Sequence, residues 1–439
     1  MTDERALGPR FWRLAIPMVL ANITVPLAGL VDAAMLGHLD TATHLAGVAL
    51  GAIVFDYLFW SFGFLRMGTT GLTSQAVGRD DALESTRIGL RALVTGVGAG
   101  CLLVVMGPVV GWLAFGLLEG EADVLRCGRA YFDWRLLGAP AALANFALTG
   151  WLLGVERSRA VLAMAVLTNV ANIVLDWVFI VRLGWASAGA GAATMLAQWL
   201  AFGLGLFLVA KPLLGQWATV RSGIWDRSAL GSWMALNRDI TIRTLALVSA
   251  FSIFTDFSAV LGTTLLASNT LMLKVISVAA WFIDGFAFAV ETLVGRFQGT
   301  GDRKSAKRLL RLGLGAALVV GLVTATAFNV WPKGLFGLLT DQVPLLDQLG
   351  LDAPVLFVVL GFGSVAYILD GWFLGISSGA VLRRTMMVSL LVGFLPLAIV
   401  ARWMSSSTLL WAAMACFMAF RVVTLGREVP ASLRRIGSE

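Results

Sequence analysis

The chain has 439 residues, of which 58% are hydrophobic and only 13% are charged, whereas an ordinary soluble domain carries about 25% charge. The net charge of +7 comes from Lys and Arg in short connections between apolar runs, which is a membrane topology signal and not a nucleic-acid-binding surface. No polar stretch is long enough for a soluble catalytic domain, and three cysteines and two histidines predict neither a disulfide framework nor a metal centre.

Apolar runs of about 18 to 25 residues recur along the chain, long enough to cross a hydrocarbon core of about 30 Å. The first follows MTDERALGPRFWRLAIP and lacks a small-residue cleavage site, so we expect a retained helix. Twelve spans are predicted, with centres near residues 25, 58, 102, 142, 171, 198, 250, 282, 319, 364, 393 and 416. An even number of spans places both termini on one side of the membrane.

The distribution of Lys and Arg predicts that this side is the cytoplasm. Of the 33 basic residues, 24 lie at the termini or in connections on their side and 5 on the opposite side. Arg421 is counted among the 24, as part of the C-terminal segment. Four more bases lie inside spans: Arg66, Arg135, Arg243 and Lys274.

Several segments recur about half a chain apart. TGWLLG at 149–154 returns as DGWFLG at 370–375, and two other matches keep the same order at offsets of 221 to 225 residues. Such repeats are typical of transporters. We therefore predict an all-α membrane protein with twelve transmembrane helices in two pseudo-symmetric six-helix lobes around a central cavity. The expected parts are an N-terminal lobe (1–215), a cytoplasmic connection (216–240) and a C-terminal lobe (241–439).

Seven acids lie in or near the spans, where carboxylates are costly and indicate function: Asp32, Asp56, Asp176, Asp256, Asp284, Glu291 and Asp370. Internal salt bridges to the in-span bases are the structural alternative, but four bases cannot pair with all seven acids. Asp256, Asp284, Glu291 and Asp370 are candidate secondary acids of the cavity.

Asp32 and Asp176 are the strongest candidates. Asp32 is 18 residues after Leu14, and Asp176 is 16 residues after Ala160, so both lie about 24–27 Å from the cytoplasmic end of their helices. Asn169, Asn172 and Asp176 share one helix face through spacings of three and four. Two carboxylates that are close in a low dielectric cannot both stay ionised cheaply, so the pair predicts a proton site. Pro26 removes a backbone hydrogen bond before Asp32, which predicts either a hinge or a fixed kink.

The segments LAGLVDAAMLGHL (27–39) and NVANIVLDWVF (169–179) and the two-repeat layout resemble the multidrug and toxic compound extrusion (MATE) family. FIDGFAFAVETLVGRFQGTGD (282–302) and YILDGWFLG (367–375) look closest to the branch named for DNA-damage-inducible protein F. The resemblance implies a cation site at Asp32, Asn172, Asp176 and Thr194. It also implies a likeness to the sodium-coupled branch at Tyr367 and Asp370, although that branch's acid on the seventh helix is expected earlier than Asp256.

We therefore expect a multi-pass protein of the bacterial plasma (inner) membrane that exports cationic or amphipathic organic compounds in exchange for protons, functions as a monomer, and needs no cofactor. One alternative is sodium coupling, with Na⁺ at the same four residues, and a second is a lipid-linked-precursor flippase. An intramembrane hydrolase could be based on the G-x-S-x-G pattern at 375–379, but that motif needs a strand-to-helix turn and a nearby histidine, so no enzyme activity is expected. A passive channel is the remaining alternative.

Overall fold

The computed structural model describes residues 7–39, 41–118, 120–215, 219–220, 223 and 226–436, and the regular elements in this part are all helices. The first half contains α1 (Leu7–Gly37), α2 (Thr43–Trp60), α3 (Phe64–Gly78), α4 (Ala82–Val105), α5 (Gly107–Leu117), α6 (Ala122–Leu136), α7 (Ala139–Gly154), α8 (Ser158–Asp176), the π-helix η1 (Trp177–Arg182) and α9 (Ala186–Gly215). The second half contains α11 (Arg227–Val260), α12 (Thr263–Thr300), α13 (Arg303–Val330), α14 (Pro332–Phe336), α15 (Val343–Asp352), α16 (Val355–Gly375), α17 (Gly379–Val388), the π-helix η2 (Ser389–Phe394), α18 (Leu395–Trp403) and α19 (Ser407–Arg435).

The number of spans agrees with the sequence. Within the described residues, eleven helical stretches are long and apolar enough to cross a membrane, and there are twelve if α6 and α7 form one span bent by 56°. All twelve predicted centres fall inside these stretches. The bend between α6 and α7 coincides with a proline in the first turn of α7. Proline has no N–H group that could continue the backbone hydrogen bonds of α6 into α7. The predicted all-helical membrane fold is therefore confirmed.

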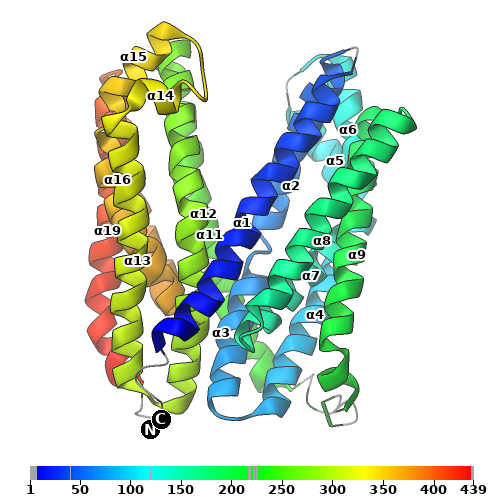
Figure 1. Cartoon of the computed structure of the whole chain (residues 1–439), viewed down its shortest axis with the longest axis vertical. Helices are drawn as coiled ribbons and strands as arrows, with labels where there is room; N and C mark the ends of the chain where they lie inside the picture. The colour runs from blue at the N-terminus through cyan, green and yellow to red at the C-terminus, as the bar shows by residue number, and fades with distance from the viewer. Residues whose placement is uncertain are drawn as a thin grey trace. The chain divides into compact units, whose positions relative to one another are not determined.

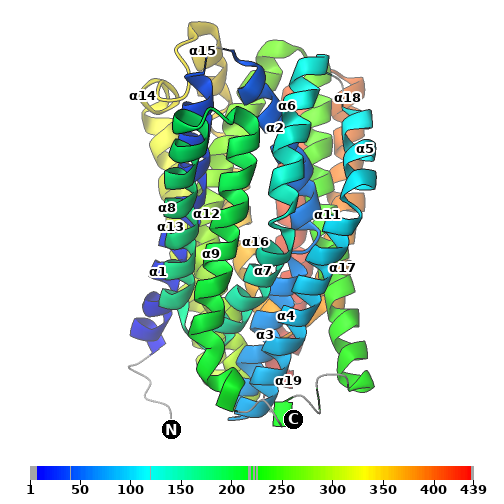
Figure 2. The same ribbon diagram turned by 90° about the vertical axis from the view of Figure 1, so that its right-hand side faces the viewer.

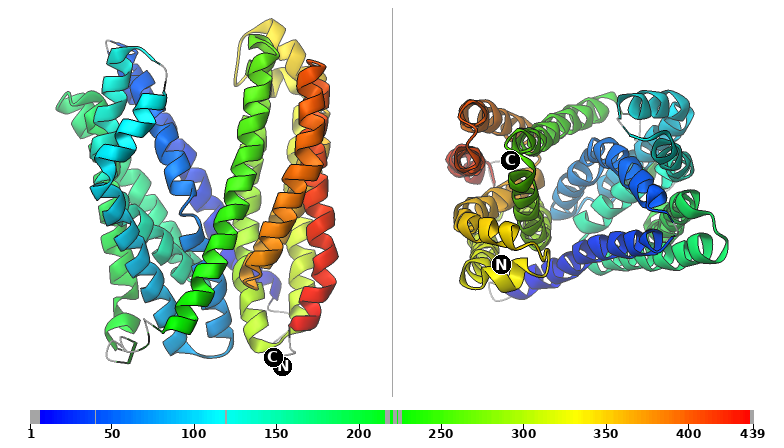
Figure 3. Two further views of the ribbon diagram at one scale, coloured as in Figure 1. Left: turned by 180° about the vertical axis from the view of Figure 1, so that it is seen from behind. Right: turned by 90° about the horizontal axis from the view of Figure 1, so that it is seen from above.

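The chain divides into two compact units, Leu20–Trp233, and Met1–Val19 together with Met234–Glu439. Within each unit the long helices lie side by side along one direction (Figures 1 and 2), and the right panel of Figure 3 shows them end-on. The predicted boundaries at 215 and 241 remain a prediction. Of the expected connection, 227–240 lies in α11, whereas 216–218, 221–222 and 224–225 lie outside the described residues.

Backbone geometry shows the internal repeat more clearly than the sequence does. Left-handed residues occur in three pairs that are each 221 positions apart: Asp80 and Gly301, Glu156 and Ser377, and Gly184 and Ser405. TGWLLG and DGWFLG are the last six residues of α7 and α16. Asp81 and Asp302 occupy matching N-caps, where their carboxylates accept the backbone N–H of Glu84 at 2.9 Å and of Ser305 at 3.0 Å. The two halves are therefore built on one plan.

Candidate functional site

The two acids predicted to act together meet in the unit Leu20–Trp233. Asp32 lies on α1 and is half-buried, while Asp176 ends α8 and is fully buried. Their carboxyl groups lie close enough to interact directly, and two carboxyl groups this close in a weakly hydrated site favour one shared proton. One oxygen of each, Oδ1, is buried and has no hydrogen-bond partner among the described residues. The pair can therefore hold one exchangeable positive charge.

The polar side chains predicted around this pair also gather there. Asn172 Nδ2 donates to Asp176 Oδ2 at 2.9 Å and lies 3.5 Å from Thr194 Oγ1 on α9. The hydroxyl of Thr194 donates to the carbonyl of Ala190 at 3.0 Å, so its oxygen is free to accept. The structure thus brings Asp32, Asn172, Asp176 and Thr194 together, as the family resemblance implied.

Asn169, one turn before Asn172, tethers α8 to α1. Its Nδ2 donates to Thr24 Oγ1 at 2.6 Å, and the Thr24 hydroxyl donates to the carbonyl of Ala21 at 2.7 Å. This contact joins the helices that carry Asp176 and Asp32. α1 remains helical through Pro26, two residues beyond Thr24, and the hinge role of Pro26 remains a prediction.

Arg135 on α6 is a neighbour of the acid pair. The sequence placed Arg135 inside a span but did not predict which residues it contacts. Its guanidinium Cζ lies 4.4 Å from the ring centroid of Phe55, and its Nη1 donates to the hydroxyl of Tyr131 at 2.5 Å. The charge of Arg135 acts on Asp32. The sequence identified Arg135 as an in-span base, and the i,i+4 spacing from Tyr131 was the available signal for their contact.

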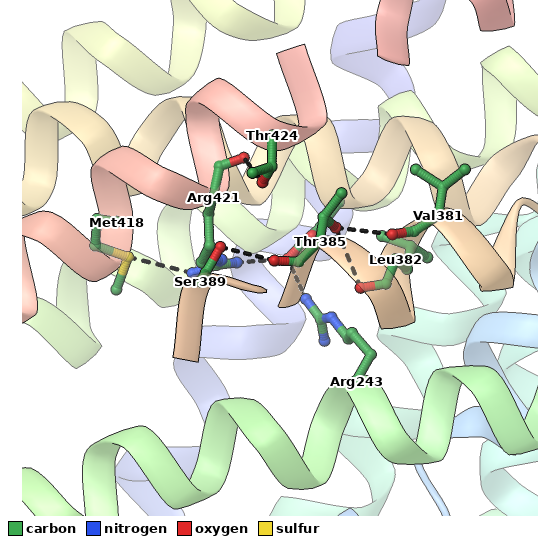
Figure 4. A network of polar contacts seen from close by, with 9 residues as sticks. Arg243, Val381, Leu382, Thr385, Ser389, Met418, Arg421 and Thr424 are labelled. Carbon is green, nitrogen blue, oxygen red and sulfur yellow. Dashed lines mark hydrogen bonds and ion pairs between the residues drawn. The ribbon is translucent and has the colours of Figure 1, made fainter. Parts of the chain in front are cut away.

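Asp370 in the other unit is paired with two arginines. Its Oδ2 accepts hydrogen bonds from Arg243 Nη2 on α11 and from Arg421 Nη2 on α19, the latter at 2.5 Å. Figure 4 shows the two arginines approaching from different helices, with Thr385 and Ser389 beside them. The salt-bridge interpretation therefore holds for Asp370.

The expectation that Arg421 belongs to the cytoplasmic C-terminal segment is wrong. Its side chain is 0% exposed inside α19, and its Nη1 lies 3.2 Å from Met418 Sδ. A span of about 20 residues centred at 416 extends to about 426, so span length was the signal that placed Arg421 in the membrane. The number of basic residues on the expected cytoplasmic side therefore falls from 24 to 23.

The other predicted secondary residues differ in how deeply they are buried. Tyr367 is half-buried. The Cζ atom of Arg421 lies 5.1 Å from the centroid of the Tyr367 ring, and Asp284 and Asp370 are its acidic neighbours. Glu291 is fully buried on α12, two turns after Asp284, whereas Asp256 is exposed near the end of α11. Among the described residues, no group of three or more His, Cys, Asp or Glu side chains could hold a metal ion.

Comparisons with known proteins agree on one family. The family model MatE matches residues 17–178 and 240–404. DNA damage-inducible protein F of Escherichia coli (strain K12) is 35% identical over 418 residues, covering 94% of this chain and 90% of that protein. A probable multidrug resistance protein NorM of Rhizobium meliloti (strain 1021) is 26% identical, covering 89% of this chain and 85% of that protein.

Solved structures share the fold. A MATE crystal structure in a bent conformation superimposes with a TM-score of 0.87 at 19% identity, covering 99% of this chain and 97% of that one. A MOP superfamily transporter from Pyrococcus furiosus Vc1 (DSM3638) gives a TM-score of 0.85 at 20% identity, covering 97% and 96%. Because one family model matches a segment in each half of the chain, and a relative is similar over nearly its whole length, this protein belongs to the MatE family of multi-pass membrane transporters and is not an enzyme.

Proposed function

We propose that this protein is a secondary antiporter that exports cationic or amphipathic organic compounds from the cytoplasm in exchange for protons. It would act as a monomer in the bacterial inner membrane, with both termini in the cytoplasm. The observation that carries the proposal is the direct interaction of the Asp32 and Asp176 carboxyl groups, each with one buried oxygen that lacks a partner among the described residues. The NorM relatives are named as probable multidrug resistance proteins, and export of drugs is one way to confer resistance.

The pair exchanges a proton for an organic cation. When the shared proton is present, the hydrogen bond between the carboxyl groups is complete and the site carries a single negative charge at most. When the proton leaves, two adjacent carboxylates in a weakly hydrated site repel each other, and an organic cation relieves that repulsion. Proton and substrate therefore compete for one site. The competition drives transport only if the two occupants favour different conformations, and a bend of α1 at Pro26 is the conformational change we propose.

Sodium is the alternative coupling ion, and the orientation of Asn172 argues for the proton. Na⁺ needs oxygen ligands, but Asn172 directs its N–H towards Asp176 and Thr194. An N–H group stabilises a carboxylate and repels a cation. A sodium site at Asp32, Asn172, Asp176 and Thr194 would require the Asn172 amide to turn over.

The lipid-linked-precursor flippase is less well supported. Binding a pyrophosphate headgroup requires basic groups that are available to the ligand. The buried arginines Arg243 and Arg421 already contact Asp370. The acids Asp32 and Asp176 favour a cationic substrate instead.

Transport in proteoliposomes tests the proposal. Ethidium flux would be measured with a proton gradient or a sodium gradient imposed separately on wild type, Asp32→Asn and Asp347→Asn. Asp347 is a matched control because its carboxylate is exposed and pairs only loosely with Lys333, at 3.4 Å. We expect proton-driven flux in wild type and Asp347→Asn, and none in Asp32→Asn.

Each other outcome has a definite meaning. Flux driven only by sodium would replace the proton with a bound ion. Proton-driven flux in Asp32→Asn would refute the role of the acid pair. No flux with either gradient would favour the flippase.

A further inference from the structure

The acid site is adjacent to an aromatic layer of the same unit. Phe55 and Tyr131 belong to a buried core that also contains three residues placed four positions from the acid-site residues. These are Leu36 relative to Asp32, Ile180 relative to Asp176, and Ala190 relative to Thr194. A spacing of four keeps two residues on one helix face, about one turn apart. The aromatic layer therefore lies about one helical turn from the acid pair.

Arg135 lies among these rings. Its Cζ is 4.4 Å from the centroid of Phe55, 5.4 Å from that of Tyr131 and 5.9 Å from that of Phe59, all within the range of cation–π attraction. Phe55 and Phe59 are themselves 5.3 Å apart. Three aromatic rings from α2 and α6 thus surround one cationic group.

The guanidinium of Arg135 has fewer polar partners than its number of N–H donors would allow. It has five N–H donors, but within the described chain its hydrogen bond goes to Tyr131, its Nε is buried without a partner, and it forms no ion pair. The negative charge nearby belongs to Asp32, which acts on Arg135 at longer range. A cation that is held by ring faces and one phenol can be displaced without breaking a salt bridge.

Aromatic rings beside carboxylates form the surface that recognises organic ammonium groups. We propose that Phe55, Phe59 and Tyr131 form a subsite for the cationic group of a substrate, filled in this structure by Arg135. A quaternary ammonium ion takes the place of the guanidinium when it binds to the deprotonated acid pair. This inference rests on the proposed function in taking the substrate to be a cation, and it adds where the charge binds and what it displaces.

Equilibrium dialysis of purified protein with radiolabelled tetraethylammonium tests the subsite. In Arg135→Gln the competing charge is gone, so Kd should fall about tenfold below the wild-type value. Arg135→Lys keeps a charge and should stay within about twofold of wild type. Arg126→Gln is the matched control, because it removes an equal charge from the same helix, where the Arg126 side chain is 78% exposed; its Kd should be unchanged.

Two further variants separate displacement from a structural effect. Tyr131→Phe removes the hydrogen bond of Arg135 but keeps the ring, so binding should tighten without loss of folding. Adding Phe55→Leu to Arg135→Gln removes a ring and should weaken binding about fivefold relative to Arg135→Gln.

An unchanged or weaker affinity in both Arg135→Gln and Tyr131→Phe would refute the subsite. If the same preparations still carry out proton-driven ethidium flux, that failure leaves the proposed antiport intact. Absence of tetraethylammonium binding in wild type and Arg135→Gln alike would also refute the subsite, whereas absence of ethidium flux would refute the antiport.

Discussion

Asp370 offers a sharp test of how a membrane acid acts, because a coupling acid and a structural acid respond differently to substitution. Asp370, Arg243 and Arg421 are 3%, 5% and 0% exposed, so neither arginine can recover hydration if the carboxylate is removed. Asp370→Asn keeps the shape of the side chain but leaves two buried guanidinium groups without their counter-ion. Removing one partner of a buried ion pair costs about 3–5 kcal/mol, and we expect a loss of unfolding free energy in this range.

The measurement is reversible unfolding in mixed detergent micelles, followed by tryptophan fluorescence. Arg421→Gln should destabilise less than Asp370→Asn, because Arg243 and Asp370 then remain as a one-to-one pair. Asp347→Asn removes an exposed ion pair with Lys333 and should change the free energy of unfolding by less than about 1 kcal/mol.

Transport by the same variants completes the test. The destabilised Asp370→Asn protein, reconstituted under conditions where it stays folded, should still couple ethidium flux to protons. The reasoning would be refuted if Asp370→Asn left the free energy of unfolding unchanged and abolished coupled transport. Asp370 would then be a coupling acid, as the likeness to the sodium-coupled branch implied.

Other predictions concern packing and helix ends. A Cβ on Gly371 would lie 2.6 Å from a backbone oxygen of α12, whereas one on Gly361 of the same helix meets nothing within 4 Å; Gly371→Ala should lower the free energy of unfolding by about 1–3 kcal/mol, and Gly361→Ala should not lower it. Asn269→Ala removes the acceptor of the buried Trp411 indole, bonded at 2.8 Å, and should cost about 1–3 kcal/mol in the same unfolding assay. The pKa of Asp226 lies below its ordinary 3.8 because it accepts hydrogen bonds from the serine hydroxyl and from the backbone amides in the first turn of α11. This cap is therefore present at neutral pH and is lost as pH falls below 3.8; Asp226→Ala should speed hydrogen exchange of that turn at pH 7 and match wild type in strong acid.

The helices were predictable because hydrophobic length decides membrane spans locally. Each predicted centre falls in a helical stretch, since a span depends on about 20 consecutive residues and little else. The repeat was also readable, although the sequence matches were weak. Left-handed residues such as Glu156 and Ser377 recur 221 positions apart because a turn between helices must be rebuilt in each copy, whatever side chains surround it.

Contacts between helices were harder to predict, because they depend on which faces meet. The face carrying Asn169, Asn172 and Asp176 was clear from spacing alone, but Arg135 beside Phe55 depends on how α6 packs against α2. Arg421 was misplaced because a basic residue near a C-terminus resembles a topology signal. Its partner Asp370 is 51 positions away, and no local pattern connects the two residues.

The two repeats put different chemistry on one backbone plan. The hexapeptides place Thr149 where the second copy has Asp370, and the position 221 residues after Asp176 is Leu397. Asp176 therefore has no acidic counterpart in the second copy, and the ion-paired Asp370 has none in the first. A carboxyl group beside another carboxyl group can exchange its proton for a different cation, whereas a carboxylate held by two arginines cannot release either one cheaply. In the antiport we propose, the exchangeable charge therefore belongs with Asp32 and Asp176, and the fixed charge with Asp370.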